Sequence, residues 1–125
     1  MKTIASLIVA FLAFGLVSNA NAAGKLHHVV CFKFKSSASK DDIKKVEDAF
    51  LALKDKVPGI EAFKWGTNVS KEQKNKGFTH CYLITFKSEK DRDAYLENPE
   101  HKAFASLVGP VVDDVFVIDF VTAKK

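Results

Sequence analysis

Hydrophobic and polar residues alternate with a period of two over residues 26–35. The side chains on one side of this segment are those of His28, Val30, Phe32 and Phe34. The other side carries Val29, Cys31 and Lys33. Alternation over this length predicts a β-strand with one face directed toward a core.

A helix is predicted directly after this strand. Ser39 is followed three positions later by Asp42, which is the pattern of a capped helix start. Apolar residues then recur at helical spacing, at Ile43, Val46, Phe50, Leu53 and Val57. Pro58 and Gly59 end the pattern, because neither residue favours the continuation of a helix.

Two further strands are predicted over residues 60–69 and 77–87, joined by a polar loop rich in Lys and Asn. Ser88 then begins a second helical region. Asn98 and Pro99 interrupt and restart this region, because Asn is a good N-cap and proline is tolerated at the first helical position.

A last strand over residues 111–120 completes the order β-α-β-β-α-β. This order predicts an α+β, ferredoxin-like domain, in which an antiparallel sheet carries its helices on one face. The other face would expose apolar side chains, namely Val29, Cys31, Leu83, Phe116, Ile118 and Phe120. An uncovered apolar face predicts a homodimer in which two sheets pack face to face.

The N-terminus differs in character from the rest of the chain. Residues 4–17 are uncharged and largely apolar, follow Lys2, and lead into Ala-Asn-Ala at 20–22, which fits the small-x-small rule of a signal peptidase site. A transmembrane anchor is the alternative, but the stretch is shorter than the roughly 20 residues that span a bilayer. We therefore expect residues 1–22 to be a cleaved signal peptide and the mature protein to be secreted or periplasmic.

Removal of this segment leaves about 102 residues, enough for one domain over residues 25–121. The mature chain has 18 Lys and Arg against 15 Asp and Glu, because the segment contains only Lys2. The most basic loop, 71–76, has no aromatic residue and no arginine. We therefore expect no nucleic-acid partner, and no further segment is apolar enough to cross a membrane.

The two cysteines, Cys31 and Cys81, each lie in the middle of a predicted strand and on its outer side. Export would permit a cross-strand disulfide between them. Two free thiols are equally compatible with the sequence, because a free cysteine packs as a small hydrophobic residue. The chain has no CxxC pattern and no His/Cys cluster, so the sequence predicts no metal site.

Taken together, these segments resemble the stress-responsive dimeric A/B barrel domain (Dabb) family. The likeness covers most of the mature chain and rests on several short motifs. They are HVVCFKFK at 28–35, PGI at 58–60 before WG at 65–66, GFTH at 77–80, and DAY at 93–95 leading to NPEH at 98–101. The resemblance implies a dimeric α+β barrel with a small apolar ligand pocket in each protomer.

The chain is similar to a plant branch of this family that contains a polyketide cyclase, which closes a linear poly-β-keto thioester by aldol condensation. The motif positions of its pocket histidines and tyrosine match His28, Tyr95 and His101, which we expect to be the catalytic residues. The substrate-binding residues that the resemblance implies are Phe50, His80, Tyr82 and Asp119. Phe50 stands where that pocket has an aromatic hydroxyl, so the pose of the substrate would differ.

Aldol closure needs a base for an acidic C–H proton and a hydrogen-bond donor for the carbonyl oxygen. In this interpretation His101 is the base, Tyr95 donates to the carbonyl oxygen, and His28 is a second polarising group. Asp119 would fix the tautomer of a neighbouring histidine. This chemistry requires no metal and no cofactor.

Each of these residues also has an ordinary structural explanation, such as a histidine near a helix start or a tyrosine that fills the core. The alternative function is therefore a non-enzymatic, stress-associated dimer that acts through its stability. A third hypothesis is oxygenation of haem or a quinol, as in other families that share this architecture. Because a fold does not determine a function, the sequence leaves the enzyme assignment open.

Overall fold

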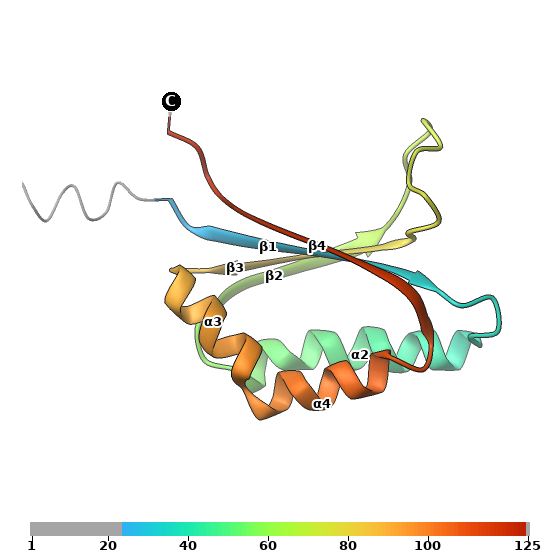
Figure 1. Ribbon diagram of the computed structural model, residues 1–125, viewed down its shortest axis with the longest axis horizontal. Coiled ribbons are helices and arrows are strands. Elements are labelled where there is room, and N and C mark those ends of the chain that lie inside the picture. Colours follow the sequence, from blue (N-terminus) through green and yellow to red (C-terminus); the bar gives the residue numbers. More distant parts are fainter. Residues whose placement is uncertain (1–23, 125) are drawn as a thin grey trace, which may run out of the picture.

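The computed structural model describes residues 24–124, and the predicted signal peptide at 1–22 lies outside them. The elements follow the order β1 (Leu26–Phe34), α2 (Lys40–Lys56), β2 (Ile60–Thr67), β3 (His80–Phe86), α3 (Glu89–Glu97), α4 (Pro99–Val108) and β4 (Val112–Val121). Neighbouring strands are antiparallel, in the spatial order β2-β3-β1-β4. All three helices cover one face of this sheet (Figure 1). The ferredoxin-like α+β fold is confirmed.

The predicted caps begin the helices. Ser39 and Asp42 form a reciprocal capping box at α2, with nitrogen-to-oxygen distances of 3.0 and 3.1 Å. Ser88 accepts a hydrogen bond from the backbone of Asp91 at α3. Asn98 separates α3 from α4, and its side chain accepts from the N–H of Glu100 at 2.8 Å. In the described part of the chain, no helix is long and apolar enough to cross a membrane.

The third strand is shorter than predicted, because it begins at His80 and not at Gly77. Lys76 and Gly77 have φ angles of 53° and 86°, so the backbone turns through the left-handed region there. The side-chain amide of Asn75 donates to the carbonyl of Phe78 at 2.8 Å and holds this turn. A local side-chain hydrogen bond thus replaces the strand ladder over these residues.

Two other strand ends also differ from the prediction. β2 ends at Thr67, and Asn68 already belongs to the loop. β4 begins at Val112, because Val111 remains in the turn after α4 and donates its N–H to the carbonyl of Val108 at 3.0 Å.

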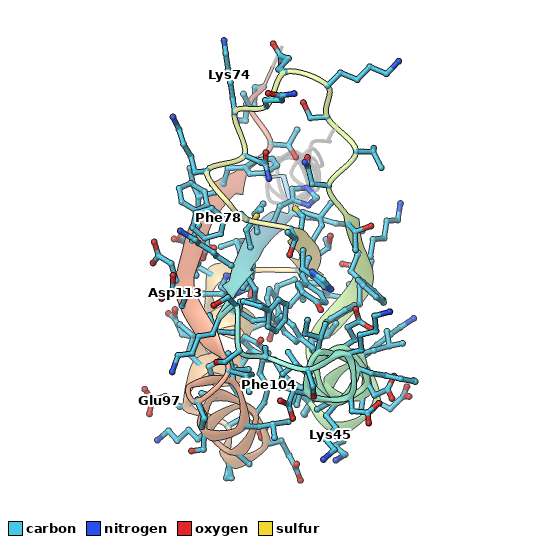
Figure 2. All side chains as sticks on the ribbon, turned by 90° about the vertical axis from the view of Figure 1, so that its right-hand side faces the viewer. Lys45, Lys74, Phe78, Glu97, Phe104 and Asp113 are labelled. Atoms are coloured by element: carbon cyan, nitrogen blue, oxygen red, sulfur yellow. The ribbon has the colours of Figure 1, made fainter. Side chains whose placement is uncertain are left out.

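The core lies between the helices and the inner face of the sheet. Phe50 of α2 stacks on Phe104 of α4 with 4.3 Å between ring centroids. Phe32 of β1 contacts Phe50 at 5.8 Å, which joins the helices to the sheet. Phe104 lies inside the molecule, between the helices and the sheet (Figure 2). The alternate residues of β1 predicted to point inward are therefore those that build this core.

The outer face of the sheet carries exposed apolar side chains. Phe116, Ile118 and Phe120 of β4 are 49, 51 and 49 % exposed. Among the described strands, β4 lies at an edge of the sheet and pairs only with β1. These large, exposed apolar side chains form the face through which the homodimer was predicted to pack.

Candidate small-molecule pocket

A cavity of about 780 Å³ opens between the β1/β4 side of the sheet and helices α3 and α4. It exists because the helices cover β4 incompletely, which leaves its inward residues Val115 and Val117 45 and 52 % exposed. Of the predicted site residues, those that line the cavity are His28, Phe50, Tyr95, His101 and Asp119. Asp113 lies on β4, at the edge of the sheet (Figure 2), and also lines the cavity. The volume falls within the range of small-molecule pockets.

The pocket holds a hydrogen-bonded chain of three side chains. His28 on β1 lies opposite Asp119 on β4 in the strand register, and its Nδ1 is 2.6 Å from Asp119 Oδ1. The other carboxylate oxygen of Asp119 accepts from Arg92 of α3, also at 2.6 Å. His28 is buried, so this carboxylate fixes the orientation of a ring that is shielded from water. Because Nδ1 is bonded to the carboxylate, Nε2 is the ring nitrogen that remains for a ligand.

Tyr95 lies between the two pocket histidines. The ring centroid of Tyr95 is 5.7 Å from that of His28 and 4.5 Å from that of His101. Asn98 and Pro99 make this contact possible, because the break between α3 and α4 brings His101 back toward the end of α3. The structure therefore brings together the three residues that were predicted to be catalytic.

Two polar atoms in this group are buried without a hydrogen-bond partner among the described residues. They are the hydroxyl of Tyr95 and Nδ1 of His101. Burial raises the pKa of the Tyr95 hydroxyl well above its usual value. Burial also lowers the pKa of His101, an effect partly offset by the nearby Leu96 backbone and reinforced by His28. At neutral pH the group therefore offers a protonated donor next to a neutral imidazole.

Phe50 closes the inner end of the cavity with an apolar surface. It stacks on Phe104 and contacts Phe63 edge-on at 5.2 Å. Both Phe50 and Phe104 line the cavity. This end of the pocket has no polar side chain to contribute, so it suits an aromatic or alkyl group of a ligand.

The structure does not place His80 and Tyr82, which were predicted to contact the substrate, in the lining of this pocket. His80 Nε2 lies 2.7 Å from Glu47 of α2, and its Nδ1 lies 3.0 Å from the Thr79 hydroxyl. Tyr82 is fully buried and stacks on Trp65. Both residues point to the inner side as predicted, but β3 lies on the far side of β1 from the cavity.

Arg92 is a pocket residue that sequence reasoning missed. It lies one helical turn before Tyr95, so the two side chains share a face of α3. Arg92 also binds the carboxylate of Asp93, at 2.8 Å. The spacing from Tyr95 was a usable signal, but an arginine at this spacing is equally common on a solvent-exposed helix face.

The pocket is lined by more acidic than basic side chains. Its lining includes four carboxylates, those of Asp93, Asp113, Asp114 and Asp119. Among the described lining residues, Arg92 supplies the positive charge. Its guanidinium is already paired with two of these carboxylates, those of Asp93 and Asp119. Within residues 24–124, no group of three or more His, Cys, Asp and Glu side chains could hold a metal ion.

Comparison with protein families matches residues 26–122 to the model of the stress responsive A/B barrel domain. A stress-response A/B barrel domain-containing protein of Arabidopsis thaliana, HS1, is 32 % identical over 99 residues, which cover 79 % of this chain and 91 % of that protein. Olivetolic acid cyclase of Cannabis sativa is 23 % identical over 97 residues, covering 78 % of this chain and 96 % of the cyclase.

Solved structures of similar proteins share the fold of this chain. A hydroxynitrile lyase from Passiflora edulis is 26 % identical with a TM-score of 0.76, covering 82 % of this chain and 96 % of the lyase. A dimeric ferredoxin-like protein of unknown function from Jannaschia sp. is 25 % identical with a TM-score of 0.70, covering 79 % of this chain and all of that one. The similar proteins thus include two named as enzymes and one described as a dimer.

Proposed function

The chain belongs to the stress-responsive A/B barrel domain family, and from this premise we propose that it binds a small, neutral, carbonyl-bearing molecule and moves a proton on it. The observation that carries the proposal is a pair of buried polar atoms without partners in the described residues, the Tyr95 hydroxyl and His101 Nδ1, on rings whose centroids are 4.5 Å apart. A buried polar group that lacks a hydrogen bond costs about 1–3 kcal/mol. A ligand that pairs both atoms would remove this cost.

The proposed roles follow from the protonation states. Tyr95 donates to the carbonyl oxygen, and its raised pKa keeps the proton on the hydroxyl. His101, kept neutral by its lowered pKa, accepts a proton from the carbon next to the carbonyl. The Tyr95 hydroxyl then stabilises the enolate oxygen, and His101 returns the proton to the product. His28, oriented by Asp119, supplies a second polar contact through Nε2.

Binding requires a small movement of the cavity wall, because the Tyr95 hydroxyl and His101 Nδ1 are both covered in the free protein. Leu96 lines the cavity, is partly exposed, and follows Tyr95 directly on α3. We propose that its side chain moves aside when the ligand enters. Exposed side chains change rotamer on a fast timescale, so this movement would not limit binding.

The ligand is proposed to be neutral because the pocket is acidic. The positive charge of Arg92 is taken up by Asp119 and Asp93. A carboxylate ligand would therefore meet further carboxylates at the rim, including Asp114, without a free cation to bind it. This argument favours ketones, aldehydes and phenols over acids and over highly charged thioesters.

The relatives support a catalytic role, since one protein of similar sequence is named as a cyclase and one of similar structure as a lyase. Phe50 supports the alternative, a pocket that only binds its ligand, because the hydroxyl implied by the resemblance is missing at this position. Proton exchange separates these two functions, because a binding protein without catalysis does not accelerate it.

The test is hydrogen–deuterium exchange at the α-carbon of an aryl alkyl ketone in D₂O, followed by NMR. We expect the chain to accelerate exchange over buffer, and general acid–base catalysis typically contributes about 10²–10⁴-fold. His101→Gln should remove the acceleration and Tyr95→Phe should reduce it. Tyr82→Phe is the matched control, because it removes another buried hydroxyl without a described partner, outside the pocket. Equal exchange rates for the unaltered chain and His101→Gln would contradict the catalytic role.

The same ketone and its carboxylate analogue test the charge argument. Asp114→Asn should increase affinity for the carboxylate by up to about fivefold, which is the scale of an exposed charge pair. Asp55→Asn, on α2 and outside the cavity lining, controls for the change in net charge. Preferential binding of the carboxylate by the unaltered chain would refute the proposed ligand class.

We also propose that the protein is exported and forms a homodimer through the outer face of its sheet. The apolar residues 4–17 support export. The exposed side chains of Phe116, Ile118 and Phe120 support the dimer, as does the dimeric description of the similar Jannaschia protein. Analytical ultracentrifugation of Phe116→Lys beside the unaltered chain tests the interface, and an unchanged mass would contradict it.

A further inference from the structure

The two cysteines meet at the centre of the outer sheet face. Cys31 of β1 lies directly opposite Cys81 of β3 in the antiparallel register. Gly66 of β2 and Phe116 of β4 extend the same row across the sheet. Both cysteines are free thiols, with Cys31 partly buried and Cys81 exposed. This pair lies on the opposite side of the sheet from the pocket residues.

The backbone geometry of the pair suits a covalent bond. Residues directly opposite in an antiparallel pair have Cα atoms about 4.5 or 5.5 Å apart, depending on the hydrogen-bonding position. Disulfides join Cα atoms roughly 4.4–6.8 Å apart. Side chains of opposite residues leave the sheet on the same face, so both thiols lie on the outer face of the sheet. Bond formation therefore needs rotation of side chains and no shift of the strands.

We propose that Cys31 and Cys81 are a modification site, which a disulfide donor such as oxidised glutathione converts into an intrachain disulfide. The exposed Cys81 loses its proton and attacks one sulfur of the donor, which releases one donor thiolate. Cys31 then loses its proton and attacks the sulfur of Cys81, which releases the second donor thiolate. The protein loses two protons and two electrons, and the donor is reduced to two thiols.

The surroundings of Cys31 decide the order of these steps and the lifetime of the product. Burial raises the pKa of Cys31 to about 11, with further contributions from the hydrogen bond and the charge of Cys81. A thiol of high pKa has little thiolate at neutral pH and is a poor leaving group. Cys31 is therefore a slow first nucleophile but a persistent disulfide partner. The site is suited to a lasting link between β1 and β3 and not to rapid redox cycling.

The test is refolding of the full chain in a buffer of reduced and oxidised glutathione. During refolding the reagent can reach both thiols even if the folded protein or its dimer covers them. We expect an intact mass two protons lower than that of the reduced chain, and a Cys31–Cys81 peptide after digestion without reductant. Cys31→Ser should retain glutathione on Cys81, because the resolving thiol is absent. When both folded single-serine variants are exposed to the same buffer, Cys81→Ser should retain much less glutathione on Cys31 than Cys31→Ser retains on Cys81.

Two results would overturn the proposal. One is that both thiols of the refolded protein remain free, or are linked only between two chains, in a buffer that oxidises model dithiols. The other is equal modification of the two single-serine variants, which would contradict the attack of Cys81 before Cys31.

Discussion

Replacement of Tyr95 by phenylalanine tests whether the tyrosine hydroxyl is kept for a ligand. Tyr95 is fully buried, and its ring contacts Phe86 at 5.2 Å and His101 at 4.5 Å between centroids. Tyr95→Phe keeps these ring contacts and removes one oxygen atom. That oxygen has no hydrogen-bond partner in the described structure, so the free protein loses no hydrogen bond.

The expected magnitude follows from the cost of a buried polar group. Removal of an unsatisfied hydroxyl should raise the free energy of unfolding by about 1 kcal/mol, at the lower end of the usual desolvation cost. For a domain of this size, that increase corresponds to a rise in Tm of roughly 4–8 °C. Ligand binding should weaken by about 0.5–1.5 kcal/mol, the net value of one hydrogen bond. This loss is roughly 2–12-fold in Kd.

The assay combines urea unfolding of the free protein with titration of an aryl ketone. Tyr82→Phe serves as the control, since the Tyr82 hydroxyl is likewise buried without a described partner but lies outside the pocket. Both variants should be more stable than the unaltered chain, and only Tyr95→Phe should bind the ketone more weakly. A loss of stability in Tyr95→Phe, or equal binding by both variants, would refute the reasoning.

The remaining predictions concern the ionisation of His101, the carboxylate of Asp119 and the proposed Cys31–Cys81 disulfide. Folding lowers the pKa of His101, so the unfolded chain takes up a proton at a higher pH than the folded chain does. The free energy of unfolding should therefore fall as the pH is lowered from about 6.5, the pKa of His101 in the unfolded chain, toward its pKa in the folded chain. Urea unfolding between pH 7.5 and 5 should show this slope, and His101→Gln should flatten it. Asp119→Asn should destabilise the chain by roughly 1.5–3 kcal/mol, because it removes the charge that His28 and Arg92 share; it should also change the ¹⁵N shift of His28 Nδ1, because Asp119 is the direct hydrogen-bond partner of this atom. The Cys31–Cys81 disulfide closes a loop of about 50 residues, for which chain entropy gives roughly 4 kcal/mol. Calorimetry of the oxidised and reduced chains should show the oxidised form melting at least several degrees higher, and an equal or lower Tm would mean that the bond strains the sheet.

Much of the fold was predictable because its signals are local. The alternation in β1 and the caps at Ser39 and Ser88 each depend on a few adjacent residues, and each was found where expected. The break at Asn98 was predictable for the same reason, since proline follows it directly. The late start of the third strand, at His80, was not predictable, because the turn at Gly77 depends on a backbone conformation that the sequence does not display.

The site was predictable in part. Parity along the strands correctly directed both His28 and His80 to the inner face. Parity does not say where a strand lies across the sheet, and the order β2-β3-β1-β4 brings His28 to the pocket and His80 to Glu47. The ion pair of Arg92 with Asp119 joins residues 27 positions apart, so it depends on the tertiary fold.

The most direct test of the central claim is an NMR titration of the protein with an aryl ketone, observed through the imidazole signals of its histidines. The proposed pocket predicts that His28 and His101 shift together with one Kd, while His80, held by Glu47 outside the cavity, remains unchanged. The absence of any shift across ketones, aldehydes and phenols, or a shift of His80 equal to that of His101, would contradict a ligand pocket built on His28, Tyr95 and His101.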